Sequence, residues 1–201
     1  MPWPRTKKDV LDELAVYYAV IDHIDKQVGR IIGQLRSDGR LKNTCVIFTS
    51  DHGLAVGSHG LMGKQNMYEH TIRVPLVIAG PEIPNAMRNN ALCYLRDLYP
   101  TICELTGVPI PESVEGRSLL PVISGKKEAV HEEVYGYFRD KQRMVRTERF
   151  KLIHYPHLDR YQLFDLVSDP DELRDISQEP ASEETMKSLK HKLREWFRSQ
   201  E

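Results

Sequence analysis

Apolar residues between positions 7 and 38 recur at steps of three and four, which predicts one long amphipathic helix. Most of the charged residues in this stretch fall on the opposite face. Thr6 is placed to cap the start of the helix, and Gly39 is a typical helix stop. A single apolar stripe requires a partner layer, so we expect this helix to cover a sheet.

Two short apolar runs, 45–49 and 74–79, predict strands. Continuous apolar runs of this length are typical of strands covered on both faces, so we expect both to lie in a parallel sheet. Residues 97–106 predict a further helix, with Pro100 in its first turn and Gly107 as its stop. The order of these elements predicts an α/β layered domain.

After about Gly125 the pattern changes to short segments in which apolar and polar residues partly alternate. This pattern predicts an antiparallel sheet with one face in solvent, and a helix over 183–199 that packs on the sheet. The expected strands are residues 130–138, 142–147, 149–155 and 161–167. The change divides the chain into two predicted domains, 1–125 and 126–201.

The composition adds mainly exclusions. A net charge of -1 gives no reason to expect nucleic acid or an anionic membrane as a partner. No apolar run approaches the roughly 20 residues of a membrane span, and the N-terminus from Met1 lacks the apolar segment of a secretory signal. Three cysteines without a CxxC spacing argue against a disulfide framework or a zinc knuckle. Cys45 and Cys103 lie in apolar surroundings and are expected to be buried thiols.

The candidate chemistry begins with Asp51 and His52, which directly follow the first predicted strand. Ligands of open α/β sheets bind at the carboxyl ends of the strands, and a carboxylate there is costly to bury unless it is paired or bound to metal. The pair could be metal ligands or an acid/base couple. An Asp that caps a turn, with a His packed beside it, is an equally weighted alternative.

A loop with four glycines follows the pair and ends in Lys64. The glycines allow positive φ and close approach of the backbone to a ligand. A lysine beside a metal site can act as a point charge for the oxygens of an anion, although most lysines are solvated surface residues. The glycines are Gly53, Gly57, Gly60 and Gly63.

A series of motifs along the chain resembles the C-terminal half of a type I sulfatase, a family of the alkaline phosphatase superfamily. The motifs are Ser50-Asp51-His52-Gly53, Gly57-Ser58-His59-Gly60, Gly63-Lys64, Tyr68-Glu69 and Arg73-Val74-Pro75-Leu76. The segments "LRDLYPTICELTGVPIPESVEGRSLLPVISG", "MVRTERFKLIHY" and "YQLFDLVSDPDEL" extend the resemblance over nearly the whole chain. So many motifs in the same order along the chain argue against a chance similarity.

The resemblance implies a partial alkaline-phosphatase-like sandwich, a mostly parallel sheet with helices, plus a small C-terminal antiparallel sheet with a packed helix. Residues 1–125 would be the C-terminal part of the catalytic α/β domain, and residues 126–201 the C-terminal α+β subdomain. Asp51 and His52 match the family's ligands of a divalent cation, usually Ca²⁺, with Mn²⁺ as the alternative because calcium prefers oxygen ligands. Lys64 matches the lysine that contacts the sulfate oxygens.

Other polar residues receive weaker assignments. His59 could line the substrate pocket, but a role in ordering the loop is favoured. Tyr68-Glu69 and Arg73 are expected to tie the loop to the following strand, and His70 is interpreted as structural. Three basic residues of the C-terminal sheet could face substrate, although a solvated sheet face is the favoured interpretation. These are Arg143, Arg146 and Lys151.

The sulfatase nucleophile is a formylglycine made within a Cys/Ser-x-Pro/Ala-x-Arg motif, and no cysteine or serine of this chain stands in that motif. The family's first pair of metal-binding aspartates also has no counterpart before the first helix. The chain is therefore expected to correspond to the C-terminal portion of a sulfatase, with the formylglycine in a missing N-terminal part. Alone, it is expected to bind metal weakly and to hydrolyse sulfate esters poorly or not at all.

Three functions follow from these residues. The first is a sulfuric ester hydrolase that acts on a carbohydrate or aryl sulfate, so the expected partner is a small-molecule or saccharide sulfate ester. The second is a phosphonate or phosphodiester hydrolase of the same superfamily, and the third is a noncatalytic remnant of a truncated or split gene. The family suggests the periplasm or secretion. The specific ester and the oligomeric state stay open.

Overall fold

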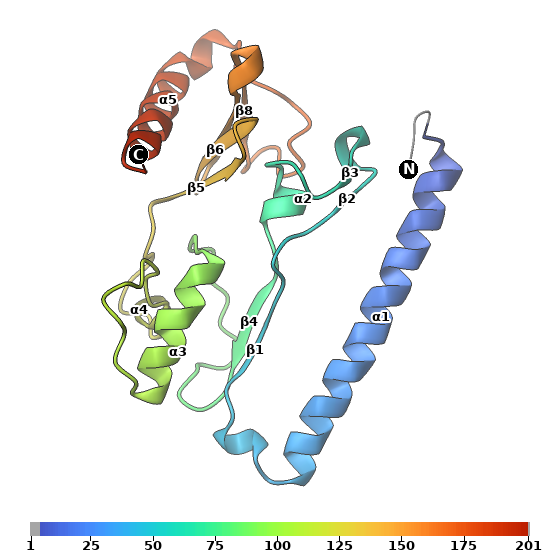
Figure 1. Ribbon diagram of the computed structural model, residues 1–201, viewed down its shortest axis with the longest axis vertical. Coiled ribbons are helices and arrows are strands. Elements are labelled where there is room, and N and C mark those ends of the chain that lie inside the picture. The colour runs from blue at the N-terminus through green and yellow to red at the C-terminus, as the bar shows by residue number, and fades with distance from the viewer. Residues whose placement is uncertain (1–4, 201) are drawn as a thin grey trace. The chain divides into compact units, whose positions relative to one another are not determined.

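The computed structural model describes residues 5–200, and its fold consists of two compact units (Figure 1). The first unit holds the chain up to Lys64 together with His70–Asn85, and the second holds Gln65–Glu69 and the chain from Ala86 onward. Residues 1–4, where no signal segment is expected, lie outside the described residues, as does residue 201. The predicted domain boundary at residue 125 stays a prediction.

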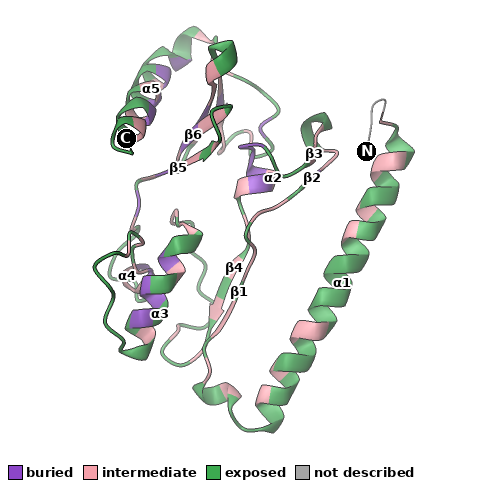
Figure 2. Ribbon diagram, viewed as in Figure 1, coloured by how far each residue is buried: buried purple, intermediate pink, exposed green. Residues whose placement is uncertain are grey.

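The first unit begins with α1 (Lys7–Ser37), as predicted. Its start is fixed by a capping box, in which Thr6 Oγ1 accepts from the Asp9 amide at 3.2 Å and Asp9 Oδ2 accepts from the Thr6 amide at 2.9 Å. It ends at Ser37 with Asp38 as its C-cap, and Gly39 follows with a φ of 69°. No residue of α1 is buried (Figure 2), so the expected sheet does not cover its apolar stripe.

The two strands that precede and follow the candidate loop are β1 (Val46–Thr49) and β4 (Leu76–Ala79). A short 3₁₀ turn (Leu41–Asn43) leads into β1. The strands form an antiparallel pair with Val46 opposite Ala79, so the parallel arrangement expected for this pair is wrong. An apolar run indicates that both faces of a strand can be buried, but it does not indicate whether the paired strand runs parallel or antiparallel.

Between these strands the chain forms a small hairpin of β2 (Ala55–Val56) and β3 (Met62–Gly63), joined by a 3₁₀ turn (Ser58–Gly60). At Gly57 φ is 92°, and a Cβ there would lie 2.6 Å from Val10 Cγ1 of α1. Glycine is therefore required both by the backbone conformation and by the close approach of the helix. The short helix α2 (Glu69–Ile72) precedes β4.

In the second unit, a 3₁₀ turn (Leu95–Asp97) leads into α3 (Leu98–Thr106), which ends at Gly107 with a φ of 70°, as predicted. The fully buried Asp97 braces this region, because Oδ1 accepts from the Arg117 amide at 2.8 Å and Oδ2 lies 2.8 Å from His131 Nε2. A carboxylate buried with several donors is a stable arrangement. The short helix α4 (Leu120–Ile123) follows.

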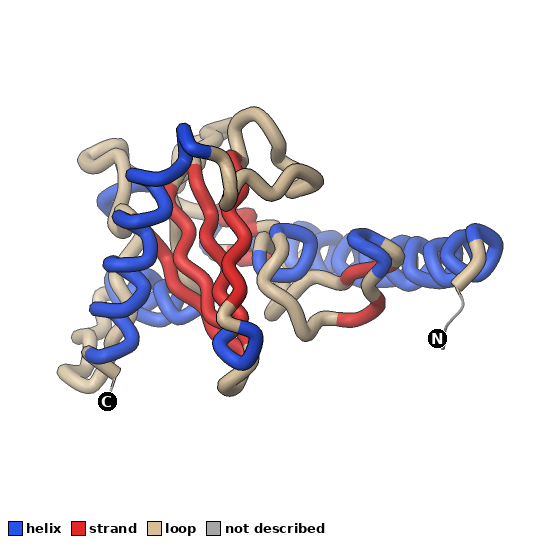
Figure 3. The backbone as a smooth tube through the Cα atoms, turned by 90° about the horizontal axis from the view of Figure 1, so that it is seen from above, coloured by secondary structure: helices blue, strands red, loops and turns tan. Residues whose placement is uncertain are grey.

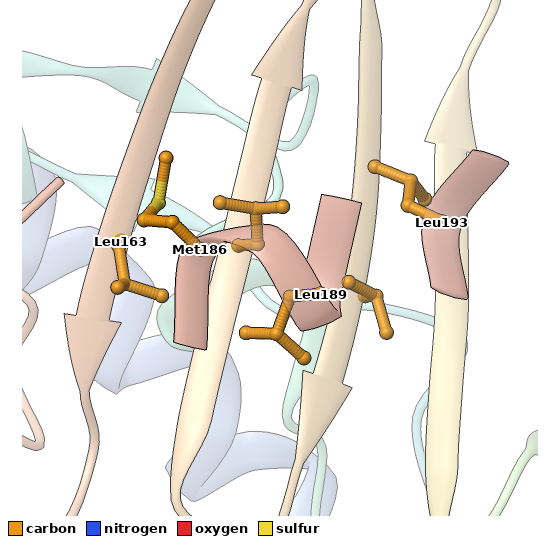
Figure 4. Packing of buried hydrophobic residues seen from close by; sticks show 6 residues of the cluster. Leu163, Met186, Leu189 and Leu193 are labelled. Carbon is orange, nitrogen blue, oxygen red and sulfur yellow. The ribbon is translucent and has the colours of Figure 1, made fainter. Parts of the chain in front are cut away.

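The rest of the second unit confirms the predicted antiparallel sheet and C-terminal helix. Four strands pair in chain order and α5 (Glu183–Arg198) covers one face (Figure 3). The core consists of Val145, Leu152, Leu163, Met186, Leu189 and Leu193 (Figure 4). Burying each of these side chains contributes about 1.5–3 kcal/mol relative to exposure. The strands are β5 (Glu133–Phe138), β6 (Gln142–Thr147), β7 (Phe150–Tyr155) and β8 (Arg160–Asp165). Two 3₁₀ turns, Pro156–Leu158 and Pro180–Ser182, precede β8 and α5.

We expected the sheet face opposite α5 to be solvated, but it is largely buried. Lys151 is completely buried there, and Arg146 is only 16% exposed. Lys151 Nζ lies 2.7 Å from Glu69 Oε1 and 2.7 Å from Glu172 Oε1. Two carboxylates brought from distant parts of the sequence compensate the buried charge, which the local alternation of β7 could not reveal.

Two smaller expectations have mixed outcomes. Cys103 is buried, as predicted, but Cys45 is exposed, and both are free thiols. The prediction for Cys45 is wrong: it directly precedes β1, and within residues 5–200 the sheet of β1 contains no strand besides β4 that could cover it. Among the helices formed by residues 5–200, none combines the length and the apolar character that crossing a membrane would require.

Candidate functional site

The candidate site lies in the first unit, where β1 ends. Asp51 Oδ1 accepts a hydrogen bond from the His52 amide at 3.0 Å, and Asp51 Oδ2 lies 3.3 Å from His52 Nε2. The Ser50 hydroxyl donates to the His52 carbonyl at 2.8 Å and fixes the turn. The Asp51 side chain is 75% exposed and that of His52 is 30% exposed, so both can reach a ligand.

The orientation of the His52 ring is set by its own backbone neighbour. His52 Nδ1 lies 3.0 Å from the Gly53 carbonyl, which can only accept, so Nδ1 carries the proton. Nε2 then has a free lone pair that can serve a cation or another donor. Metal-binding histidines are commonly held in this way by a carbonyl on the other ring nitrogen.

The β2–β3 hairpin brings Lys64 back to the same place. Ala55 pairs with Gly63, so the chain returns beside its own start and Lys64 follows. Lys64 Nζ lies 2.6 Å from His52 Nε2 and donates to its lone pair. The structure therefore brings all three predicted residues together. Their roles as metal ligands and sulfate contact stay predictions.

Gly53 anchors the start of the loop through its backbone. Its amide donates to the Thr71 carbonyl at 2.8 Å, and a Cβ at this position would lie 2.1 Å from the His70 carbonyl oxygen. Only glycine fits between the chain after β1 and the backbone of residues 70–71. The sequence indicated the loop's glycine content, and the structure shows which contact requires it.

The donor set is chemically suited to a divalent cation but incomplete. Two ligand atoms in neighbouring coordination positions, each roughly 2.0–2.4 Å from a cation, lie about 3 Å apart. The 3.3 Å between Asp51 Oδ2 and His52 Nε2 fits such a pair. Calcium takes about six to eight oxygens. Among residues 5–200 no group of three or more His, Cys, Asp or Glu side chains could hold a metal ion.

His59 occupies the turn of the hairpin with a φ of 55°, which is uncommon for a residue with a side chain. Its ring centroid lies 5.4 Å from that of His70, tilted by 34°. This contact joins the hairpin to the segment that follows it and agrees with the favoured ordering role. A place for His59 in a substrate pocket stays a prediction.

Residues 65–69 are fixed to the four-stranded sheet. Lys151 Nζ donates to the Met67 carbonyl at 3.1 Å, and the Tyr68 hydroxyl donates to Gln162 Oε1 at 3.0 Å. Glu69 Oε1 lies 3.2 Å from Arg146 Nε. Sequence reasoning expected Tyr68 and Glu69 to bind the following strand and placed Lys151 on a solvated sheet face, whereas its side chain is completely buried. The one available signal was a lysine flanked by apolar residues in a strand.

The two carboxylates around Lys151 have opposite pKa shifts. Burial alone would raise the pKa of Glu69, but the charges and hydrogen bonds of Lys151 and Arg146 outweigh it and lower the pKa. Burial raises the pKa of Glu172, and Lys151 offsets only part of this effect. Glu172 Oε2 also accepts from the Glu69 amide at 2.6 Å, which holds the two acids together.

Two family sequence models match the chain. The model described as sulfatase matches residues 3–108. The model described as N-sulphoglucosamine sulphohydrolase, C-terminal, matches residues 57–199. Together they cover both compact units and all three site residues.

Two of the proteins that resemble the chain in sequence are named as sulfatases. Arylsulfatase K of Bos taurus is 37% identical over 203 residues, which is 94% of this chain and 37% of that protein. N-acetylglucosamine-6-O-sulfatase of Bacteroides thetaiotaomicron is 32% identical over 80% of this chain and 31% of that protein. The chain therefore spans about a third of the length of these relatives.

Solved structures confirm the predicted α/β class. A structure in complex with its substrate D-glucosamine-2-N,6-O-disulfate has a TM-score of 0.81 at 30% identity, over 89% of this chain and 39% of that chain. Phosphonate monoester hydrolase of Agrobacterium radiobacter has a TM-score of 0.81 at 28% identity, over 97% of this chain and 43% of that chain. The shared fold thus occurs with both sulfate and phosphonate ester hydrolases.

Proposed function

The chain belongs to the sulfatase family, and from that premise we propose that it forms part of a sulfuric ester hydrolase that releases sulfate from a carbohydrate or aryl sulfate. The observation that carries the proposal is the 2.6 Å approach of Lys64 Nζ to His52 Nε2 beside Asp51. A carboxylate, an imidazole and an ammonium thereby share one strand end. This set can hold a cation and an anion side by side.

In this proposal Lys64 binds and orients the ester. Its ammonium carries a point charge on a flexible stem and is exposed, so it can turn from His52 to an oxygen of a sulfate group. Negative charge grows on the sulfate oxygens and the leaving oxygen during S–O cleavage. A fixed positive charge beside these oxygens lowers the barrier.

Asp51 and His52 would supply two ligands of a divalent cation, with Ca²⁺ as the first expectation and Mn²⁺ as the alternative. When bound, such a cation withdraws charge from the sulfate oxygens. The Gly53 carbonyl keeps His52 Nδ1 protonated, so the lone pair on Nε2 stays directed outward. The remaining ligands and the formylglycine nucleophile are proposed to lie outside this chain.

A saccharide sulfate is the substrate class that the comparisons favour. One relative is named as a sulfatase of N-acetylglucosamine, and one similar structure holds a disulfated glucosamine as its substrate. Arylsulfatase K is named for aryl esters, which keeps this class in the proposal. The alternative function, phosphonate ester hydrolysis, is supported by the likeness to phosphonate monoester hydrolase.

The test compares esters in the whole protein that contains this chain. With an aryl sulfate and a phenylphosphonate ester of the same phenol, we expect kcat/KM to be higher for the sulfate. Lys64→Ala should lower kcat/KM by about 10²–10³, the usual loss when one charge-stabilising donor is removed. Lys42→Ala, at an exposed position in the 3₁₀ turn before β1, serves as the matched control. A higher kcat/KM for the phosphonate would favour the alternative, and equal activity of Lys64→Ala would refute the role of Lys64.

A second measurement addresses the cation without relying on turnover. The isolated chain should bind Ca²⁺ no more tightly than about 10⁻³ M, because it supplies few of the required oxygens. Isothermal titration calorimetry compares the isolated chain with its Asp51→Asn variant. The variant should have a still lower affinity for Ca²⁺. Tight binding by the isolated chain, or binding indifferent to Asp51, would contradict the proposed ligand set.

A further inference from the structure

A row of three side chains crosses the four-stranded sheet on the face covered by α5. Arg143 of β6 lies opposite His154 of β7, and His154 lies opposite Tyr161 of β8. Each stands two positions from a core residue of its own strand, so each points to the same face as the core. The His154 and Tyr161 rings are stacked with centroids 4.1 Å apart and planes at 4°.

Helix α5 adds further groups to this row. Lys190, Arg194 and Phe197 are spaced by four and three positions and share one side of the helix. Lys190 Nζ lies 4.0 Å from the centroid of the Tyr161 ring, and the Arg143 guanidinium carbon lies 3.5 Å from the centroid of the Phe197 ring. Burial and the charge of Asp159 raise the pKa of Tyr161, and the nearby charge of Arg194 opposes this rise. We call the three basic side chains Arg143, Lys190 and Arg194, together with the His154 imidazole, the α5 cation row.

The charges of the α5 cation row lack protein counterions. Within residues 5–200, none of its arginine or lysine side chains has a carboxylate oxygen within 4.0 Å. The other edge of the same helix differs, because Lys192 Nζ there pairs with Glu133 Oε2 at 2.7 Å. Asp159, in the turn before β8, approaches the row at its imidazole. Its Oδ1 lies 4.0 Å from His154 Nε2, and its side chain is 94% exposed.

Two nitrogens of the row are also buried without a hydrogen-bond partner among residues 5–200. Arg143 Nε and His154 Nε2 are inaccessible to solvent and have no hydrogen-bond acceptor among residues 5–200. Burial and the charge of Arg143 lower the pKa of His154, Asp159 opposes this effect, and Lys190 of α5 lowers the pKa further. Groups from β6, from the turn before β8 and from α5 thus leave a net positive field at this place.

We propose that the α5 cation row binds a tetrahedral oxyanion, either a sulfate group or a phosphate group. Such an anion brings several acceptor oxygens and a negative charge to a place where three basic side chains face a single exposed carboxylate, that of Asp159. A guanidinium offers a planar fork of donors, and lysine adds a movable point charge. The site lies on the opposite sheet face from the Lys151 cluster, and the inference does not depend on the proposed hydrolase function.

The oxyanion could be free or could belong to a sugar ester, and the choice of probes separates these sources. Inorganic sulfate, inorganic phosphate and glucosamine 6-sulfate are titrated against the ¹⁵N-labelled chain in the Lys64→Ala background, which removes the lysine of the candidate active site. Binding of an anion at the α5 cation row should raise the pKa of His154, because a nearby negative charge favours the imidazolium. A preference for the sugar ester identifies an ester as ligand, whereas equal binding of sulfate identifies the free ion.

Variants on the exposed side of α5 give the decisive comparison. Arg194→Gln should weaken binding about threefold, and Lys190→Gln with Arg194→Gln about tenfold, since each contact to a charged oxygen is lost. Lys192→Gln, on the other edge of the same helix where its ammonium pairs with Glu133, should stay within twofold. Circular dichroism verifies folding, and Arg194→Gln alone remains informative if the double variant unfolds. Unchanged binding in Arg194→Gln, an equal loss in Lys192→Gln, or no saturable binding of any probe overturns the site.

Discussion

Lys64 Nζ and His52 Nε2 lie 2.6 Å apart although the two residues are twelve positions apart in the chain. The hairpin of β2 and β3 produces this contact, because its paired strands return the chain to the end of β1. The Gly53 carbonyl, 3.0 Å from Nδ1, determines that the lone pair lies on Nε2, where the ammonium donates. The contact therefore depends on a backbone acceptor as well as on two side chains.

The first prediction concerns the tautomer of His52. In the folded chain at neutral pH, Nδ1 should carry the proton and Nε2 should have none, since the Gly53 carbonyl accepts only. Long-range ¹H–¹⁵N spectra of the imidazole distinguish the two nitrogens directly. In Lys64→Met the ¹⁵N shift of Nε2 should change while that of Nδ1 stays the same. A proton found on Nε2 would mean that the described contact is absent.

The second prediction concerns the buried cation in the C-terminal sheet. Lys151→Met should lower the free energy of unfolding of the second unit by about 3–5 kcal/mol, because Glu69 and Glu172 keep buried carboxylates without this partner. Urea denaturation monitored by tryptophan fluorescence measures the change. Lys187→Met, at an exposed position of α5, should change stability by less than about 0.5 kcal/mol. Similar values for both variants would show that the cluster contributes little.

The sequence predicted those elements whose signals are local. Thr6 and Gly39 mark the ends of α1, and Gly107 marks the end of α3, because caps and left-handed stops depend on one or two residues. The C-terminal helix was predictable for a similar reason, since its apolar spacing directly reflects the face that meets the sheet.

Properties that depend on distant partners were not predictable. The antiparallel direction of β1 and β4 follows from a long connection, about which an apolar run says nothing. The burial of Lys151 depends on Glu69 and Glu172, 82 residues before and 21 residues after it in the sequence. At the candidate site, resemblance selected the residues, whereas the contact between Lys64 and His52 required the folded hairpin.

The third prediction is a pH dependence of opposite sign for two glutamates. The pKa of Glu172 is raised above the model-peptide value of 4.5, so the folded chain holds this proton more tightly than the unfolded chain. As pH rises from 4.5 through the folded-state pKa, the native protein loses the corresponding stability. Glu172→Gln cannot ionise, so its stability relative to the native protein should rise over this interval.

Glu69→Gln is the matched comparison. The pKa of Glu69 is lowered below 4.5, so its contribution is fully present above pH 4.5 and is lost as pH falls through the folded-state value. The stability of this variant relative to the native protein should therefore be lowest above pH 4.5 and recover in acid. Urea titrations between about pH 3 and pH 7 provide both curves, because this range includes the ordinary glutamate pKa of 4.5. Parallel curves for the two variants would exclude opposite shifts.

The fourth prediction compares two glycines of the first unit. Gly53→Ala places a methyl group where the His70 carbonyl oxygen would be 2.1 Å away, so the segments after β1 and around residue 70 must separate and the 2.8 Å bond to Thr71 is strained. Overpacking of this kind costs about 1–3 kcal/mol. Gly29→Ala adds the same methyl group on α1, where no atom lies within 4 Å, and should stabilise the helix by about 0.5–1 kcal/mol. Thermal unfolding of both variants should therefore move in opposite directions. A shift of the same sign in both would show that Gly53 is not held against the backbone of residues 70–71, and the placement of His52 beside Lys64 would then lack its anchor.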